Sequence, residues 1–336
     1  MKAWQYTSTK GGIEKNLKLN ASVPLPKPKP NQHLVQIIAS ALNPVDYKPA
    51  ELPIIGRLLR PKPATPGLDF AGRIVTPAAG SSLQVGDLIF GVAGTHIAGG
   101  ALAEFGIVLP DRSGKIPEGV DPVNAATIGV AGLTAYQSIV PHVKKGDKIF
   151  INGGSGGCGC WGIQIAKQVG CHVTTACSTV NVELCKSLGA DEVIDYKKQN
   201  VIETLAKTGY KYDFVVDNVG GDYQLWWRAP EYVKPEAKFV VVGHTISFGE
   251  ILDQLKRKLL PGFLGGIKHH VDDFWPEAKP EDCLQIARWI REGGVRAVID
   301  HKFSFDEAPQ AFIKLKTGRA RGKVVVDVAS ETYNRG

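Results

Sequence analysis

The stretch KIFINGGSGGCGCWGIQIAKQVGCHVTTACST, residues 148–179, decides the fold of this 336-residue chain. It predicts a strand, a glycine-rich turn, a helix and a second strand, because the apolar run 149–151 leads into a turn and then a helical pattern. Gly154, Gly156 and Gly159 satisfy G-x-G-x-x-G, which tightens the chain, lets backbone N–H groups approach a pyrophosphate and packs helix against strand. The chain holds 38 Gly, so a lone match is weak. The flanking strand and helix make it a predicted dinucleotide site.

Composition places the chain among ordinary globular enzymes. A length of 336 residues suits two domains, and 43% hydrophobic with 22% charged residues provides for a sizeable core. The formal charge of +7 and the pI near 9.0 permit anionic ligands without singling out a membrane or a nucleic acid. No aromatic-basic RNA motif is present, so no nucleic-acid partner is expected.

The cysteines and the chain start indicate a cytoplasmic protein. Cys158 and Cys160 form only C-x-C, and no second Cys or His pair completes a zinc site. The six cysteines are therefore interpreted as reduced thiols, with a redox role for Cys158 and Cys160 left open. The start MKAWQYTSTKGGIEKN lacks the apolar core of a signal peptide, and no run approaches the roughly 20 apolar residues of a membrane span.

Residues 1 to about 125 are predicted to be rich in β-strands. The best strand candidates are 34–42, 69–75 and 87–92, which are short apolar or alternating runs. The Pro-Lys alternation at 24–30 predicts an extended surface connector, because proline lacks a donor and restricts the preceding residue.

From about residue 125, strands alternate with helices, which predicts a doubly wound parallel sheet. The expected strands after the opening unit are 192–196, 213–217 and 238–243, and the expected helices are 182–188, 201–207 and 223–232. Another helix is predicted at 281–291. Helix 306–316 and strand 323–328 end the chain and are assigned back to the first domain.

Residues 246–277 form the least regular part, and its basic portion, 251–268, has three open interpretations. It is a lid over the active-site cleft, a subunit contact, or a piece that makes peripheral contact with a membrane. A structural insertion is favoured, and membrane contact is the weaker interpretation because the apolar face is short.

Six motifs in order carry a family resemblance over nearly the whole chain. They are NPVDYK (43–48), PGLDFAG (66–72), VGDLIFG (85–91), GLTAYQS (132–138), GGSGGCG (153–159) and KSLGADEVIDY (186–196). With them the chain resembles the zinc-independent quinone oxidoreductase branch of the medium-chain dehydrogenase/reductase superfamily. Within that branch it most resembles the alkenal/enone reductases and the chloroplast-envelope-type quinone oxidoreductase homologues.

The resemblance implies an α/β architecture with two domains and a cleft between them. A GroES-like β-rich catalytic domain takes residues 1–124 and 301–336, and a Rossmann domain that binds NADPH takes 125–300. Zinc alcohol dehydrogenases place a Cys ligand near the position of Leu42 and a His-Glu pair at the positions of Leu68 and Asp69. Because these ligands and the four-cysteine lobe after about residue 90 are missing, no metal site is expected.

The predicted cofactor is NADPH. NAD-selective sites place an acid about twenty residues beyond the glycine turn, whereas this second strand ends CHVTTACSTVN. Ser178, Thr179 and Asn181 offer neutral hydrogen bonds to a 2′-phosphate, with Lys167 or Lys186 as a source of positive charge. The alternative for Ser178 and Thr179 is a helix N-cap.

Further cofactor contacts come from the glycine turn and from the resemblance. Cys158 is expected to pack as a small hydrophobe while its N–H faces the pyrophosphate. Gly243, His244 and Thr245 are expected beside the nicotinamide carboxamide, because strand carboxyl ends face the crevice. The remaining expected contacts are Ser155, Gly156 and Gly157 in the turn, and by resemblance Thr134, Tyr196, Asn218 and Lys323.

Reduction of an α,β-unsaturated carbonyl needs a hydride, a donor at the carbonyl oxygen and a proton. Lys48 is the first candidate for the carbonyl contact, because an ammonium group stabilises a nascent enolate most in a water-poor cleft. Asn43 and Asp46 are expected to orient the nicotinamide ribose. Tyr47 is a weaker candidate for proton relay, with solvent an equal source. The alternative is a plain capped turn with a surface lysine.

The sequence leaves three functions to weigh. The first is an NADPH-dependent reductase of enones, enals or quinones, working as a homodimer or a monomer on a small-molecule substrate. The second is a trans-acting enoyl reductase of a biosynthetic pathway, which would meet an acidic carrier protein through basic patches at 57–62 and 256–258. The third is NADPH-regulated binding to RNA, a membrane or a protein partner with little catalysis.

Overall fold

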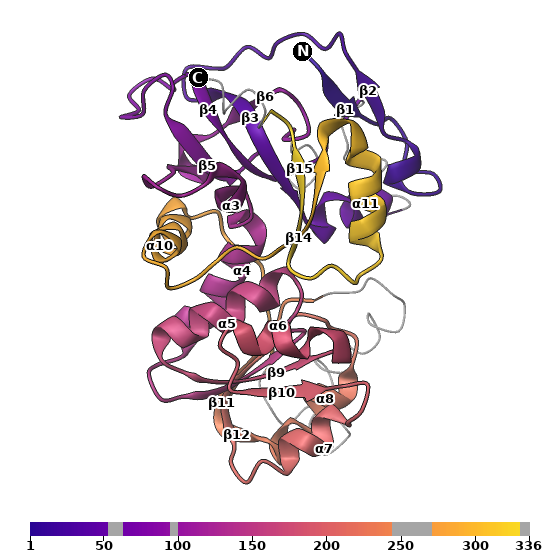
Figure 1. Cartoon of the computed structure of the whole chain (residues 1–336), viewed down its shortest axis with the longest axis vertical. Coiled ribbons are helices and arrows are strands. Elements are labelled where there is room, and N and C mark those ends of the chain that lie inside the picture. The colour runs from indigo at the N-terminus through magenta and orange to yellow at the C-terminus, as the bar shows by residue number, and fades with distance from the viewer. Residues whose placement is uncertain (53–62, 95–99, 244–270, 330–336) are drawn as a thin grey trace. The chain divides into compact units, whose positions relative to one another are not determined.

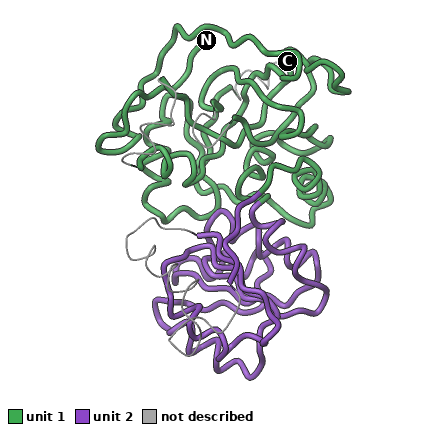
Figure 2. The backbone as a smooth tube through the Cα atoms, turned by 180° about the vertical axis from the view of Figure 1, so that it is seen from behind, with its two compact units in different colours: residues 1–133, 277–336 green, residues 134–276 purple. Residues whose placement is uncertain are grey.

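The computed structural model describes residues 1–52, 63–94, 100–243 and 271–329 (Figure 1). Contacts divide the chain into two compact units, Met1–Leu133 with Glu277–Gly336, and Thr134–Pro276 (Figure 2). The sequence predicts domain boundaries at 124/125 and 300/301, whereas the units meet at 133/134 and 276/277. Helix α10 (Pro280–Arg291) explains part of this difference, because its Leu284 packs closely over Gly114 in the first unit.

The second unit is built on a six-stranded sheet in the order β10-β9-β8-β11-β12-β13. Its described strand pairs are all parallel. Counted from β8, the order is the 3-2-1-4-5-6 pattern of dinucleotide-binding folds, so the predicted doubly wound sheet is confirmed. The strands are β8 (Lys148–Asn152), β9 (His172–Cys177), β10 (Glu192–Asp195), β11 (Tyr212–Asp217), β12 (Val233–Val241) and β13 (Val271–Asp273).

Helices connect these strands and bury apolar faces against the sheet, with α5 and α6 drawn on one side and α7 and α8 on the other (Figure 1). Ile202 and Leu205 of α7 and Leu225 of α8 share a core with Phe150 and Phe239 of the sheet. The helical elements are α5 (Gly157–Val169), α6 (Val182–Ser187), α7 (Val201–Ala206) and α8 (Tyr223–Trp227), and the 3-10 turns η4 (Val140–His142), η5 (Thr179–Asn181) and η6 (Ala229–Glu231).

Two expected elements of this unit have different bounds. The helix predicted over 223–232 stops as α8 at Trp227 and continues only as the 3-10 turn η6. Pro230 explains the break, because proline lacks an N–H and clashes with the preceding turn. The strand predicted over 238–243 is β12, which begins at Val233 and pairs with β11 through a register shift.

The first unit is built on a seven-stranded sheet in the order β14-β15-β3-β4-β5-β7, with β6 paired to β3. β15 and β14 come from the end of the chain and extend the sheet next to β3, as a GroES-like domain made of both chain ends requires. The strands are β3 (His33–Leu42), β4 (Asp69–Thr76), β5 (Leu88–Val92), β6 (Phe105–Val108), β7 (Ser113–Lys115), β14 (Ile299–Ser304) and β15 (Lys323–Asp327), and β1 (Ala3–Gln5) and β2 (Lys18–Asn20) form a separate pair.

Helices and turns cover this sheet and carry the residues that follow β3. Phe312 and Leu315 of α11 pack with Leu42, Val324 and Val326 of the sheet in one apolar core. The elements are α1 (Lys48–Glu51), α3 (Pro122–Ala126), α10, α11 (Ala308–Lys316) and the start of α4 (Gly129–Ile139), which continues into the second unit from Thr134, with the 3-10 turns η1 (Ile13–Lys15), η2 (Pro44–Asp46), η3 (Pro110–Arg112) and η8 (Phe305–Glu307). Register places Leu42 beside Val324 and Ala41 beside Asp69, so the end of β3 meets the starts of β4 and β15.

Candidate active site

The glycine turn joins β8 to α5 and leaves no room for side chains at two of its positions. A β-carbon on Gly159 would overlap the carbonyl oxygen of Gly153 and lie 2.7 Å from the carbonyl carbon of Gly154. A β-carbon on Gly154 would overlap the hydroxyl of Thr175. Gly156 differs, because a β-carbon there would meet only one atom, at 3.6 Å. The glycine turn therefore packs tightly against the N-terminus of α5. At Gly156 the turn leaves space in which an anion can approach the helix N-terminus.

Ser155, Ser178 and Asn181 come together beside this turn. The amide nitrogen of Asn181 donates to the hydroxyl of Ser155 at 3.0 Å and to that of Ser178 at 3.1 Å. Asn181 is 9% exposed, and its carboxamide oxygen is buried with no hydrogen-bond partner in the described part of the chain. Ser178 occupies the N-cap position of η5 without a side-chain capping bond, so the alternative of a simple cap is not realised there. Thr179 is exposed beside it.

The point where the strand order reverses, between β8 and β11, is held by the buried Asp217. Its Oδ1 accepts hydrogen bonds from the Asn152 amide at 2.8 Å and from the backbone N–H groups of Val219 and Gly220 at 3.0 and 3.1 Å. The Asn218 amide donates to the Asn152 carbonyl at 3.2 Å. Ligands of such sheets bind in the crevice outside the strand ends at this reversal.

The other expected cofactor residues of this unit have diverse surroundings. Gly243 packs on the turn after β11, because a β-carbon there would overlap the backbone of Val219. Thr134 is 3% exposed on α4, and Tyr196 is 50% exposed just after β10. Gly157 and Cys158 form the first turn of α5, with Cys158 half-buried. His244 and Thr245 lie outside the described residues, and so does the whole segment 251–268.

A buried polar network in the first unit gathers Asn43, Asp69 and Lys323. The Lys323 ammonium donates to Asn43 Oδ1, to the Leu42 carbonyl at 3.1 Å and to Asp69 Oδ2 at 3.1 Å. The Asn43 amide donates to Asp69 Oδ2 at 2.8 Å. Asp69 Oδ1 accepts from the Val130 N–H at 2.7 Å. The carboxylate of Asp69 thus holds the side-chain amide of Asn43, the ammonium of Lys323 and the first turn of α4.

Asp46 is the second buried carboxyl of this network. Its Oδ2 accepts the Asn43 N–H at 2.6 Å, while its Oδ1 is buried with no hydrogen-bond partner among the described residues. Burial, and then the charge of Asp69, raise the pKa of Asp46 from 3.8 to about 7. The ribose contact expected of Asp46 stays a prediction.

We expect Asp46→Asn to remove a pH dependence of stability. A pKa raised in the folded state means that folding takes up a proton, so the stability that Asp46 gives is full below about 4 and is lost as pH rises through 7. The slope is at most about 1.4 kcal/mol per pH unit. Urea unfolding of both proteins between pH 5 and 8 measures it. If the difference between the two unfolding free energies is constant over this range, the pKa of Asp46 is not raised.

Tyr47 and Lys48 follow the network in the chain and face different surroundings. Lys48 is exposed at the first position of α1. Tyr47 is half-buried, packs against the core that contains Phe312, and lies with its ring centroid 5.4 Å from the Lys316 ammonium. Burial, followed by the charge of Glu51, raises the pKa of Tyr47. The carbonyl contact of Lys48 and the relay by Tyr47 stay predictions.

Comparison with known proteins covers nearly the whole chain. Family models described as an alcohol dehydrogenase GroES-like domain and a zinc-binding dehydrogenase match residues 29–118 and 188–326. The trans-enoyl reductase pgmF of Aspergillus terreus is 48% identical, over 99% of this chain and 97% of its own. The chloroplast envelope quinone oxidoreductase homolog of Arabidopsis thaliana is 32% identical, over 97% and 98%. This chain belongs to the medium-chain dehydrogenase/reductase superfamily.

Within the superfamily, the chain is an oxidoreductase of the quinone and enone reductase branch. A solved structure of the quinone oxidoreductase from Coxiella burnetii superposes with a TM-score of 0.84 at 30% identity, over 98% of this chain and 99% of its own. The fold class and the resemblance predicted from the motifs are therefore confirmed.

This medium-chain reductase contains, among its described residues, no group of three His, Cys, Asp or Glu side chains arranged for a metal ion. Leu42 and Leu68 are buried apolar residues, and the carboxylate of Asp69 is bound to Lys323. Over the same described ranges, no helix is long and apolar enough to span a membrane.

Two buried carboxylates that organise the candidate site, Asp69 and Asp217, are not singled out by the sequence patterns. Asp69 lies in the motif PGLDFAG, where the sequence marks it only as a position without a zinc ligand. Asp217 ends a predicted strand just before Asn218, and a carboxylate at the end of a buried strand was the available signal.

Proposed function

We propose that this protein uses NADPH to reduce the activated C=C bond of α,β-unsaturated carbonyls, or quinones. The observation that carries the proposal is its similarity over nearly the whole chain to proteins described as a trans-enoyl reductase and quinone oxidoreductase homologues. An enoyl group and a quinone both hold a C=C bond conjugated to a carbonyl, so one reaction type covers both names.

The choice of NADPH is supported by the chemistry at the end of β9. Asn181 donates to the Ser178 hydroxyl, which leaves the hydrogen of that hydroxyl as a neutral donor, and no carboxylate occurs in residues 171–181. An anionic 2′-phosphate is therefore not repelled by residues 171–181. These residues also lack the acidic side chain with which NAD-selective sites bind the ribose hydroxyls. The open side of Gly156 leaves room for a pyrophosphate, and the unpartnered oxygen of Asn181 can accept a hydrogen bond from a ribose hydroxyl.

The residues of the first unit are assigned roles in handling the acceptor. Bound NADPH supplies the hydride. Lys48 donates a hydrogen bond to the carbonyl oxygen, where negative charge develops. Asn43 and Asp46 orient the cofactor ribose, and Lys323 holds Asn43 in place from the other side. The proton for the α-carbon comes from Tyr47 or from solvent.

A second candidate is a trans-acting enoyl reductase, whose substrate is an enoyl thioester carried by a partner protein. It is favoured by the 48% identity to the Aspergillus trans-enoyl reductase, compared with 32% for the chloroplast envelope homolog. The basic patches expected to meet an acidic carrier, 57–62 and 256–258, fall on residues that the structure does not describe. A cytoplasmic location and a homodimeric or monomeric state complete the proposal.

One panel experiment tests both candidates. NADPH and NADH oxidation are followed at matched concentration with short enones, quinones and enoyl thioesters. We expect turnover that prefers NADPH and is reduced at least about tenfold by Lys48→Ala with the fold intact. Turnover confined to enoyl thioesters favours the second candidate. Tight NADPH binding with no turnover of any acceptor overturns both and leaves a binding role.

A further inference from the structure

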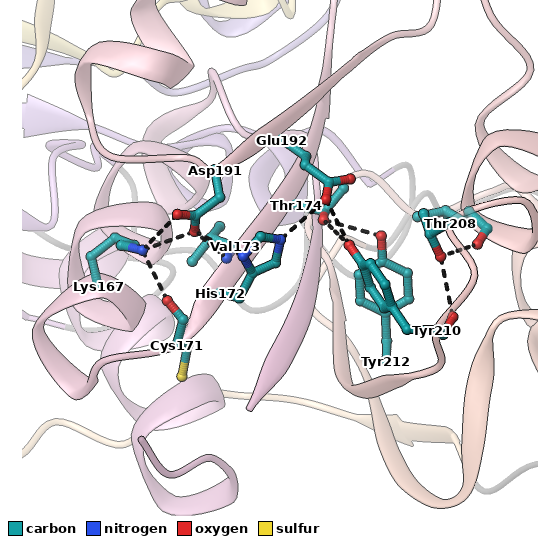
Figure 3. Close-up of polar contacts among 11 residues, drawn as sticks. Lys167, Cys171, His172, Val173, Thr174, Asp191, Glu192, Thr208, Tyr210 and Tyr212 are labelled. Atoms are coloured by element: carbon teal, nitrogen blue, oxygen red, sulfur yellow. Dashed lines mark hydrogen bonds and ion pairs between the residues drawn. The ribbon is translucent and has the colours of Figure 1, made fainter. Parts of the chain in front are cut away.

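The two lysines expected to supply positive charge near the 2′-phosphate are paired with carboxylates. Lys167 donates to both oxygens of Asp191, at 3.0 and 2.8 Å, and to the Cys171 carbonyl at 3.1 Å (Figure 3). These partners stand at the amino ends of β9 and β10, where His172 and Glu192 begin the strands. The adenosine of the cofactor is expected at the opposite, carboxyl ends of β9 and β10. Lys167 is therefore excluded as the residue that contacts the 2′-phosphate. Lys186 pairs with Glu183 at 3.0 Å, in the last turn of α6.

Lys197 lies at the correct end of the sheet. β10 pairs in parallel with β9, with Asp195 beside Cys177. The Tyr196 N–H then donates to the Cys177 carbonyl at 3.1 Å, which fixes the chain beside the residue that precedes Ser178. Lys197 follows directly, and its N–H donates to Asp195 Oδ1 at 3.0 Å. Lys197 therefore follows β10 at the same, carboxyl end of the sheet at which Ser178 follows β9.

The charge of Lys197 is not neutralised within the described part of the chain. Its ammonium lies 5.5 Å from the ring centroid of Tyr196, and no described carboxylate forms an ion pair with it. The next residue differs, because the Lys198 ammonium lies 3.8 Å from Asp195 Oδ2. The buried Asp195 thus accepts a backbone hydrogen bond from Lys197 and forms an ion pair with Lys198.

We propose that Lys197 is the cation that selects NADPH over NADH, by binding the 2′-phosphate beside Ser178 and Asn181. The inference rests on the proposed use of NADPH and names the residue responsible. A lysine ammonium binds phosphate as a compact point charge, and charge-assisted hydrogen bonds are about twice as strong as neutral ones. Tyr196 holds the ammonium loosely by a cation–π contact until the phosphate arrives.

The test measures binding without catalysis. Calorimetry on the full chain gives Kd for adenosine 2′,5′-bisphosphate and for 5′-AMP, which differ only in the 2′-phosphate. We expect the wild-type protein to bind the bisphosphate at least about tenfold more tightly, with a preference that falls as salt rises. Lys197→Gln loses this preference while its Kd for 5′-AMP is unchanged, and Lys197→Arg keeps most of it.

Lys198→Gln is the matched control, because it removes the same charge one residue away. It is expected to keep the preference for the bisphosphate. The proposal is overturned if Lys197→Gln keeps the wild-type preference, if Lys198→Gln loses as much, or if the wild-type protein shows no preference. Unchanged selectivity in Lys197→Gln together with NADPH-dependent enone turnover would reject Lys197 alone, whereas equal use of NADH and NADPH by the wild type would reject the proposed cofactor.

Discussion

Gly159→Ala is expected to weaken the binding of NADPH strongly. The added methyl group would overlap the Gly153 carbonyl oxygen and approach the backbone of Gly154, and backbone atoms cannot turn aside as a flexible side chain does. The N-terminus of α5 must therefore shift away from the turn, taking its N–H groups out of reach of the pyrophosphate. We expect NADPH affinity to fall about 100-fold and the free energy of unfolding to fall by about 1–3 kcal/mol. Calorimetry and urea unfolding measure the two effects.

Gly162→Ala is the control on the same helix. A β-carbon there would lie 3.2 Å from the terminal methyl of Ile139, which must shift by a few tenths of an ångström, and at an ordinary 3.6 Å from that of Ile151. Alanine also favours a helix over glycine by about 1 kcal/mol. We therefore expect near wild-type stability and NADPH binding. If Gly159→Ala binds NADPH within threefold of Gly162→Ala, the closeness of helix and turn does not govern the site.

The sequence predicted the elements with a clear local pattern and missed those without one. Strands 34–42, 69–75 and 87–92 match β3, β4 and β5 within about one residue, because buried apolar runs with Gly or Pro at their ends are local signals. β14 was not predicted. Its sequence IDHKFS lies at the edge of the sheet with no fully buried residue, so pairing to β15 alone makes it a strand.

The sequence suggested candidate site residues where one motif carries them, and their roles stay predictions. NPVDYK pointed to Asn43 and Asp46, which the structure joins by a hydrogen bond, and the glycine turn with CSTVN pointed to Ser155, Ser178 and Asn181, which form one cluster. The role of Asp69 was not predictable, because it depends on contacts across 254 residues of sequence to Lys323. That contact exists only because β3 pairs with β4 on one side and with β15 on the other. Strand order of this kind is a tertiary property without a local pattern.

We expect Asp69→Ala to be the most destabilising of the changes considered. Asp69 is fully buried and Lys323 is 3% exposed, so the change leaves a buried ammonium without its carboxylate. It also removes the acceptor for the Asn43 amide and the Val130 N–H. Breaking a buried pair by removing one partner costs about 3–5 kcal/mol. Urea unfolding followed by circular dichroism measures the decrease in the free energy of unfolding. The side chain of Asn43 should also lose its fixed position, because its acceptor is gone.

Asp87→Ala is the matched comparison. Asp87 also pairs with a lysine, at 2.6 Å, but Lys115 is 61% exposed, and such surface pairs contribute about 0–1 kcal/mol. The double change Asp69→Ala with Lys323→Met then separates the ion pair from the rest of the network. Because it removes the stranded charge, it should be less destabilising than Asp69→Ala alone. If the double variant instead loses the sum of the two single effects, Asp69 and Lys323 are not coupled, and Asp69 acts only through its hydrogen bonds to Asn43 and Val130.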